Sequence, residues 1–190
     1  MTSHGGLRLR RSTVWIGILA VALTSAACAD SPAPEGGEGS TTTVAEHVLA
    51  STEGRFSVEM PGEAARTVQQ EAVGDITLEI VLYNVEVGDE YAYQAVYVDY
   101  PDSLGRLDPD GTLNGAANGA ANRTGGKLTK SERLEYLGRP AIQFEVTVDG
   151  AHVEARTVLD GRRLYTLQAV SKTPPAPGFA RMVETFTITG

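Results

Sequence analysis

One cysteine carries the clearest chemical signal in the chain. Cys28 is the only cysteine among 190 residues. It directly follows three small residues, Ser25, Ala26 and Ala27. In an exported protein a lone cysteine has no intramolecular partner, so it is a free thiol, an intermolecular bridge or a modified residue.

The residues before Cys28 predict export. Arg8, Arg10 and Arg11 form a basic region without acidic neighbours, and an apolar run over residues 14–22 follows. A basic region, a short apolar run and small residues in this order are typical of a secretory signal peptide. The apolar run is too short to span a bilayer as a stable helix. We therefore interpret residues 1–27 as a signal peptide.

The junction resembles the lipobox of bacterial lipoproteins, in which the cysteine receives a diacylglyceryl group and becomes the mature N-terminus. This resemblance implies lipidation of Cys28 and an outward-facing anchor in the cell membrane. The family usually has leucine where this chain has Ser25. Ala27-Cys28-Ala29 also fits an ordinary signal-peptidase site, where cleavage would remove the cysteine and release a secreted soluble domain. Both outcomes stay open at this point.

Few other side chains have the spacing that catalysis or metal binding needs. His47 and His152 are the histidines that follow the signal peptide, and neither has a metal-ligand spacing. The carboxylates Asp99 and Asp102 follow a predicted strand and could serve a cell-envelope hydrolase that acts on wall glycans. The sequence contains no nucleophile elbow and no phosphate-binding glycine loop. We therefore expect no enzymatic activity, no metal and no cofactor, and keep the hydrolase as the alternative.

Tyrosines form the candidate binding surface. Tyr91, Tyr93, Tyr97 and Tyr100 lie within ten residues of one another. Tyrosine is favoured at interfaces, so these rings could line a groove for an envelope protein or a small ligand. Tyrosine is equally common inside strands, where the ring packs and the hydroxyl reaches solvent. Because the sequence does not say which rings are exposed, both interpretations stay open.

The net charge argues against nucleic acid as a partner. After the signal peptide the chain has 24 acidic and 13 basic residues, a net charge of −11, whereas phosphate contacts need clustered Lys and Arg. Residues 28–110 contain 17 acidic and 3 basic residues, and residues 111–190 contain 7 and 10. Strands from both halves that share one sheet would bring opposite charges together. A polarised surface is the other interpretation.

Composition divides the mature chain into two parts. Residues 28–45 are rich in Pro, Gly, Ser and Thr, which predicts a disordered tether. Residues 46–190 are long enough to form one globular domain with its own core. Apolar residues recur there with the period of strands over the following ranges: 55–60, 67–72, 76–87, 91–100, 127–137, 141–148, 153–159 and 164–170.

Two helices interrupt these strands. Small apolar residues at helical spacing predict a helix that starts near Pro109 and ends at Gly125. Gly115 and Gly119 weaken this helix, and we expect their small face to allow close approach to a sheet. A short amphipathic helix is predicted over 179–186. The fold class is therefore α+β: an antiparallel sheet of about seven strands, with the hairpin of the two long strands at its centre and helices flanking it.

This pattern resembles the PsbP/Mog1-like domains, which include many bacterial lipoproteins. The resemblance rests on the opening Phe56-Ser57-Val58-Glu59-Met60-Pro61, the central hairpin, the small-residue helix, and Gly161-Arg162-Arg163-Leu164-Tyr165 before the last helix. It covers Glu46 to Gly190 and implies a sheet between helices, an α/β/α arrangement, without catalytic residues. The better-known members are accessory or binding proteins with unrelated partners, so the fold does not name a partner. We expect an extracytoplasmic, lipid-anchored accessory or binding protein.

Overall fold

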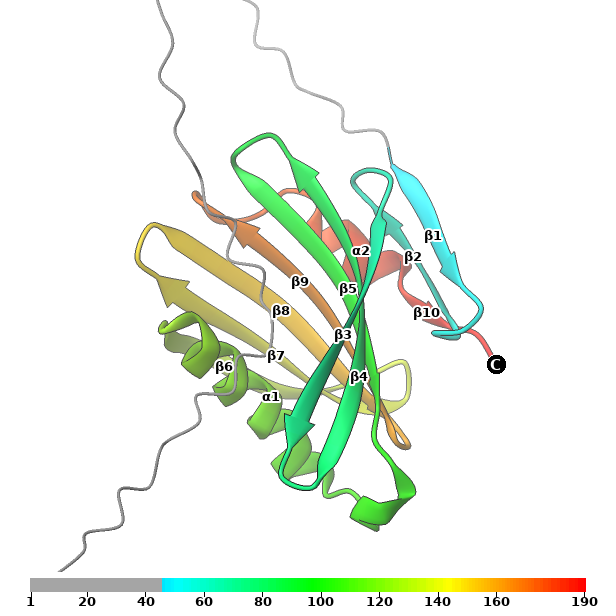
Figure 1. Cartoon of the computed structure of the whole chain (residues 1–190). Coiled ribbons are helices and arrows are strands. Elements are labelled where there is room, and N and C mark those ends of the chain that lie inside the picture. The colour runs from blue at the N-terminus through cyan, green and yellow to red at the C-terminus, as the bar shows by residue number, and fades with distance from the viewer. Residues whose placement is uncertain (1–45) are drawn as a thin grey trace, which may run out of the picture.

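The computed structural model describes residues 46–190. The predicted signal peptide (1–27), the proposed lipidation site Cys28 and the predicted tether (28–45) lie outside the described residues. Within 46–190 the strands form two sheets, and two α-helices pack against them (Figure 1). No helix in this part of the chain is long and apolar enough to cross a membrane.

The large sheet has seven antiparallel strands, as the sequence predicts. Their spatial order is β3 (Ala65–Val73), β4 (Ile76–Val87), β5 (Tyr91–Asp99), β9 (Arg163–Ser171), β8 (Ala151–Asp160), β7 (Arg139–Val148) and β6 (Lys127–Tyr136). The β4–β5 hairpin was expected at the centre, but β9 is the middle strand. The reason is that the segment after β5 carries the chain to the far edge, from which β6 to β9 fill the sheet inward.

The helix α1 (Pro109–Thr124) covers one face of the large sheet, here called the α1 face. It follows the short 3-10 turn η1 (Asp102–Leu104) and packs on β6, β7 and β8. The Asp108 carboxylate caps the helix by accepting hydrogen bonds from the amides of Asp110 (3.3 Å) and Gly111 (2.8 Å). Gly125 ends the helix with a left-handed φ of 66°.

The expected glycine contact between α1 and the sheet is wrong. Gly115 is exposed, and a Cβ built there would meet nothing within 4 Å. A Cβ on Gly119 would meet only the Arg123 side chain. The residues that pack on the sheet are Leu113, Ala117, Ala120 and Ala121. Alanine therefore provides the close packing, because its methyl group fills the contact without holding the helix away.

The opposite face, here called the α2 face, carries a second sheet and the helix α2 (Phe179–Thr185). The small sheet has the order β1 (His47–Ser51), β2 (Phe56–Met60) and β10 (Thr187–Ile188). The Phe56 ring packs at 6.0 Å from Tyr165 of the large sheet and at 5.7 Å from Phe186. Residues 56–60 were expected in the single sheet, but they instead pack on its face. The second layer is thus α2 with a small sheet beside it (Figure 1).

Candidate functional site

Polar side chains gather where the turn between β1 and β2 meets the large sheet. We call this group the Arg163 corner. It consists of Ser51, Glu53, Arg66, Tyr83, Tyr97, Asp99, Arg163 and Tyr165. The pairing of β5 with β9 sets its geometry, because the register places Asp99 opposite Arg163 and Tyr97 opposite Tyr165.

The Arg163 guanidinium is the centre of the corner. Its Nε donates to Asp99 Oδ1 at 2.6 Å, and a second nitrogen donates to Asp99 Oδ2. The third nitrogen donates to the Glu53 carbonyl at 2.9 Å. The guanidinium also lies 4.8 Å from the centroid of the Tyr97 ring. The hydrogen bonds to Asp99 raise the pKa of Arg163, so this side chain is a fixed cation, and each of its three nitrogens donates a hydrogen bond within the corner.

Three tyrosine hydroxyls of the corner have different surroundings. Tyr165 donates to the Gly54 carbonyl at 2.9 Å, and Tyr83 shares a hydrogen bond of 2.8 Å with the Ser51 hydroxyl. The Tyr97 hydroxyl is buried and makes no hydrogen bond with a described residue. Burial, with the nearby charge of Glu53, raises the pKa of Tyr97 to about 12. A phenol of this kind keeps its proton at neutral pH.

These contacts attach the β1–β2 turn to the sheet. Arg163 and Tyr165 each bond a carbonyl of the turn, and Ser51 Oγ accepts from the Gly54 amide at 2.9 Å. Arg66 pairs with the Glu53 side chain at 2.9 Å on the exposed side of the turn. The chemistry of the corner is therefore that of a structural clasp, with its strongest donors and acceptors bonded to each other.

The predicted tyrosine surface is corrected by the burial of its members. Tyr93 is 1% exposed and Tyr97 is 4% exposed, so both belong to the core of the α2 face. Tyr91 is half-buried and stacks on Tyr93 with 6.3 Å between ring centroids. Tyr100 is half-buried on the other side of the sheet, against the α1 cluster. Because side chains alternate along a strand, Tyr91, Tyr93 and Tyr97 of β5 lie on the same face of the sheet. The layer formed by α2 and the small sheet covers that face.

The carboxylates of the hydrolase alternative are both held by arginines. Both oxygens of Asp99 accept from Arg163. Asp102 is exposed at the start of η1 and pairs with Arg162 Nε at 3.0 Å. The Arg162 side chain also donates to the backbone carbonyls of Tyr100 and Gly105. Asp99 thus joins β5 to β9, and Asp102 helps Arg162 to hold the segment after β5. Among residues 46–190, no group of three or more His, Cys, Asp or Glu side chains is arranged to hold a metal.

A second group of polar side chains lies on the α1 face, and no local sequence pattern predicts it. Glu71 of β3 is 6% exposed, and its Oε2 has no hydrogen-bond partner among described residues. Burial raises the pKa of Glu71, while the charge of Arg123 on α1 opposes that shift. Burial lowers the pKa of Arg123 and raises that of Tyr100. The charges of Glu71 and Arg123 thus influence each other, but the two side chains form no ion pair.

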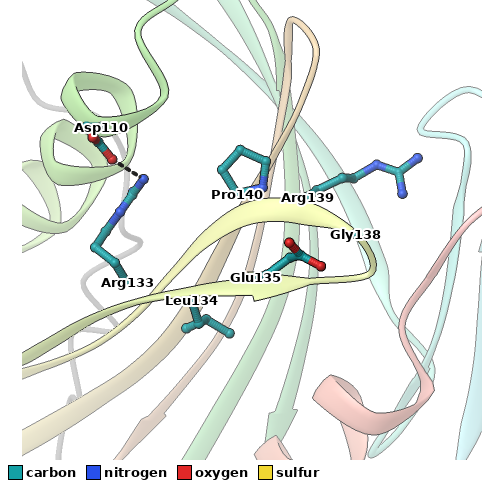
Figure 2. A pocket seen from close by; sticks show the side chains of 7 residues that line it. All are labelled: Asp110, Arg133, Leu134, Glu135, Gly138, Arg139 and Pro140. Atoms are coloured by element: carbon teal, nitrogen blue, oxygen red, sulfur yellow. Dashed lines mark hydrogen bonds and ion pairs between the residues drawn. The ribbon is translucent and has the colours of Figure 1, made fainter.

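An open hollow of about 620 Å³ lies between the start of α1 and the β6–β7 hairpin. Figure 2 shows the Arg133 side chain reaching Asp110, to which it donates a hydrogen bond of 2.5 Å. Arg139 points away from this pair and forms an ion pair of 2.7 Å with Asp160. The residues that line the hollow are Asp110, Arg133, Leu134, Glu135, Gly138, Arg139 and Pro140. Its arginines are thus already engaged with carboxylates.

The fold, rather than a reactive group, connects this chain with known proteins. No protein-family model matches the sequence, and no curated protein matches it. Among solved structures, the chain is similar to the solution structure of cyanobacterial PsbP (CyanoP) from Synechocystis sp. PCC 6803. The two share 13% identity with a TM-score of 0.51, and the match covers 82% of this chain and 99% of that one. The chain therefore has a PsbP-like fold, which confirms the fold expected from the sequence.

Proposed function

We propose that this chain is an extracytoplasmic, lipid-anchored accessory or binding protein without enzymatic activity. The observation that carries the proposal is the PsbP-like fold of residues 46–190. The better-known PsbP/Mog1-like domains serve as accessory or binding proteins, and such domains work by presenting surfaces to partners. The partner is an envelope protein or a small ligand outside the cell.

The Arg163 corner supports the non-enzymatic part of this proposal. A catalytic carboxylate or phenol needs a free position toward the substrate. Asp99 has both oxygens engaged by Arg163, and Tyr97 and Tyr165 are buried. These groups stabilise the turn between β1 and β2, which leaves them unsuited to turnover.

The anchor is supported by the sequence alone. Cys28 follows the export signal directly and matches the cysteine of a lipobox. Diacylation contributes about 0.8 kcal/mol for each buried CH₂, so two chains hold a protein stably at a membrane. The domain would then face outward from the membrane that carries it.

The decisive experiment is intact-mass analysis of the mature protein from the membrane fraction and from the medium. We expect a membrane-bound chain that begins at Cys28 and carries acyl mass. The matched control is Cys28→Ala, which should carry no acyl mass at all. An unmodified wild-type chain that begins at Asp30 and accumulates in the medium would contradict the anchor.

The absence of turnover is tested separately with cell-wall glycans. We expect no hydrolysis by the wild type. Hydrolysis that is lost in Asp99→Asn but kept in Arg163→Gln would overturn the proposal, because both variants break the same ion pair and only the first removes the carboxylate.

A further inference from the structure

The two outer strands of the large sheet differ in how their edges are protected. β6 has an irregular register between Leu128 and Lys130, and it carries Lys127, Lys130 and Arg133. Bulges and lysines of this kind keep a free edge from pairing with another chain. β3, at the opposite edge, pairs with β4 over nine residues without a break and contains no lysine and no proline. The edge of β3 is therefore open to strand addition.

Most side chains of β3 are exposed, including its two valines. Seven of its nine residues are exposed, and the exceptions are Gln69 and Glu71. Val68 and Val73 are 40% and 45% exposed and belong to the few large apolar residues that the described chain leaves at the surface. Among residues 46–190, β3 pairs with β4 alone, so its outer backbone amides and carbonyls face away from the sheet. Such an edge can bind an extended segment through main-chain hydrogen bonds.

The charge around this edge indicates which segment it would take. Three exposed acidic residues lie next to β3 along the chain or on β4: Glu63, Asp75 and Glu79. None of the three forms an ion pair with another residue of 46–190. The one cation on β3, Arg66, is already paired with Glu53. A basic partner would therefore find complementary charge, whereas a second copy of this acidic chain would be repelled.

We propose that the outer edge of β3 docks an extended segment of a partner protein that carries lysine or arginine among β-branched residues. The segment adds an eighth strand to the sheet next to β3. Main-chain hydrogen bonds supply affinity, the exposed valines contact its apolar side chains, and the acidic residues select its basic ones. This inference deepens the proposed function, because it names the surface and the partner chemistry of an accessory protein.

The test uses the purified mature chain and a synthetic peptide of alternating lysine and valine, as long as β3. Binding is measured by calorimetry at low ionic strength and mapped by amide chemical shifts. We expect saturable binding with shifts confined to β3 and β4. A control peptide with proline in place of valine keeps the charge but loses every second backbone amide and the β-branched side chains, and we expect it to bind at least about fivefold more weakly.

Two matched variants locate the binding edge. Val68→Lys places a like charge against the basic peptide, and we expect it to weaken binding at least about fivefold. Ser131→Lys adds the same charge at an exposed position of the opposite edge strand and should leave binding unchanged. Thermal unfolding of both variants shows whether each is folded, and only folded variants are compared.

Three results would overturn the proposal. Equal binding of the proline peptide would mean that charge alone attracts the ligand. Equal loss in Val68→Lys and Ser131→Lys would place the site elsewhere. Self-association of the wild type that Val68→Lys abolishes would make a second copy the occupant. The membrane and mass experiment on Cys28 does not depend on any of these outcomes, so the two proposals fail separately.

Discussion

Tyr97 and Tyr165 face each other across β5 and β9, but only one of their hydroxyls is hydrogen-bonded. We predict that Tyr165→Phe lowers the free energy of unfolding by about 1–2 kcal/mol, because it leaves the buried Gly54 carbonyl without its donor. Tyr97→Phe should leave stability unchanged or raise it by about 1 kcal/mol, since it removes an unpaired buried polar atom. Chemical denaturation at neutral pH measures both. An equal loss in the two variants would mean that the Tyr97 hydroxyl has a partner.

Tyr97 also predicts an alkaline loss of stability. Its pKa in the folded chain is about 12, above the ordinary 10.0, so the folded state holds this proton more tightly than the unfolded state does. The folded state therefore loses stability as the pH rises from 10 through 12. We expect Tyr97→Phe to lose less stability than the wild type over that interval. Denaturation midpoints at several alkaline pH values test this, with Tyr165→Phe as the comparison.

Glu71 gives a second prediction of pH dependence, near neutral and acidic pH. Burial raises its pKa above the ordinary 4.5, so the folded state binds this proton more tightly than the unfolded state. The charged carboxylate then costs stability as the pH rises from 4.5 through the raised value, and the cost persists at pH 7. We expect Glu71→Gln to be more stable than the wild type at pH 7 by up to about 1 kcal/mol, with the gain shrinking below pH 4.5. A gain that grows on acidification would contradict this.

At the scale of elements, α1 offers a direct test of helix propensity. Gly115 is exposed with open space around it and has no positive φ, so Gly115→Ala should stabilise the protein by about 0.5–1 kcal/mol. Gly126 is the matched control just beyond the same helix. A Cβ there would lie 2.7 Å from Val146 and 2.8 Å from the Thr147 carbonyl, so Gly126→Ala should destabilise. Thermal unfolding should show a raised midpoint for Gly115→Ala and a lowered midpoint for Gly126→Ala.

The sequence predicts most elements of the large sheet and the strand β2, but it fails for the other two strands of the small sheet. β4, β5, β7, β8 and β9 have strong apolar periodicity, so their positions follow from local pattern. β1 and β10 lack this periodicity, because β1 is largely exposed and β10 has only two residues. Their strand character comes from pairing with β2, which is a tertiary contact that no local window contains.

The Arg163 corner could not be predicted for a related reason. Its members come from residues as far apart as Glu53 and Arg163, and the β5–β9 register brings them together. Local pattern did predict the tyrosine-rich strand itself. It could not say that β2 and α2 would cover the face on which Tyr93 and Tyr97 lie. Exposure of a ring is decided by the second layer, and that layer follows from the topology of the whole chain.

At the scale of the whole molecule, ion pairs join the acidic and basic halves of the chain. Arg133 pairs with Asp110, Arg162 with Asp102, Arg163 with Asp99, and Arg181 with Glu46 and Glu59. In each pair the arginine lies in residues 111–190 and the carboxylate lies in residues 28–110. The uneven charge along the sequence is thus partly balanced in space, as strands from both halves of one sheet would require. Glu63, Asp75 and Glu79 near β3 are among the acidic residues of 46–110 that form no ion pair with another residue of 46–190.

The two faces of the large sheet should unfold together. β9 is shared by both cores, since Leu167 packs in the α2-face cluster and Leu164 in the α1-face cluster. Six of the seven tyrosines belong to the α2 face, so the near-ultraviolet circular dichroism signal reports mainly on that side. The far-ultraviolet signal reports on the strands of the whole sheet. A molecule of this size with one shared sheet is expected to unfold in a single transition.

Two large-to-small substitutions test whether the two faces of the large sheet unfold together or independently. Phe186→Ala empties the α2-face core and Phe144→Ala empties the α1-face core, where both rings are 2% exposed. We expect each to lower the free energy of unfolding by about 3–5 kcal/mol and to shift the near- and far-ultraviolet transitions equally. Glu132→Ala on the exposed side of β6 is the control and should shift neither. A Phe144→Ala variant that keeps the wild-type near-ultraviolet transition would mean that the α2 face is stable without its neighbour, because the shared strand β9 then fails to couple the two cores.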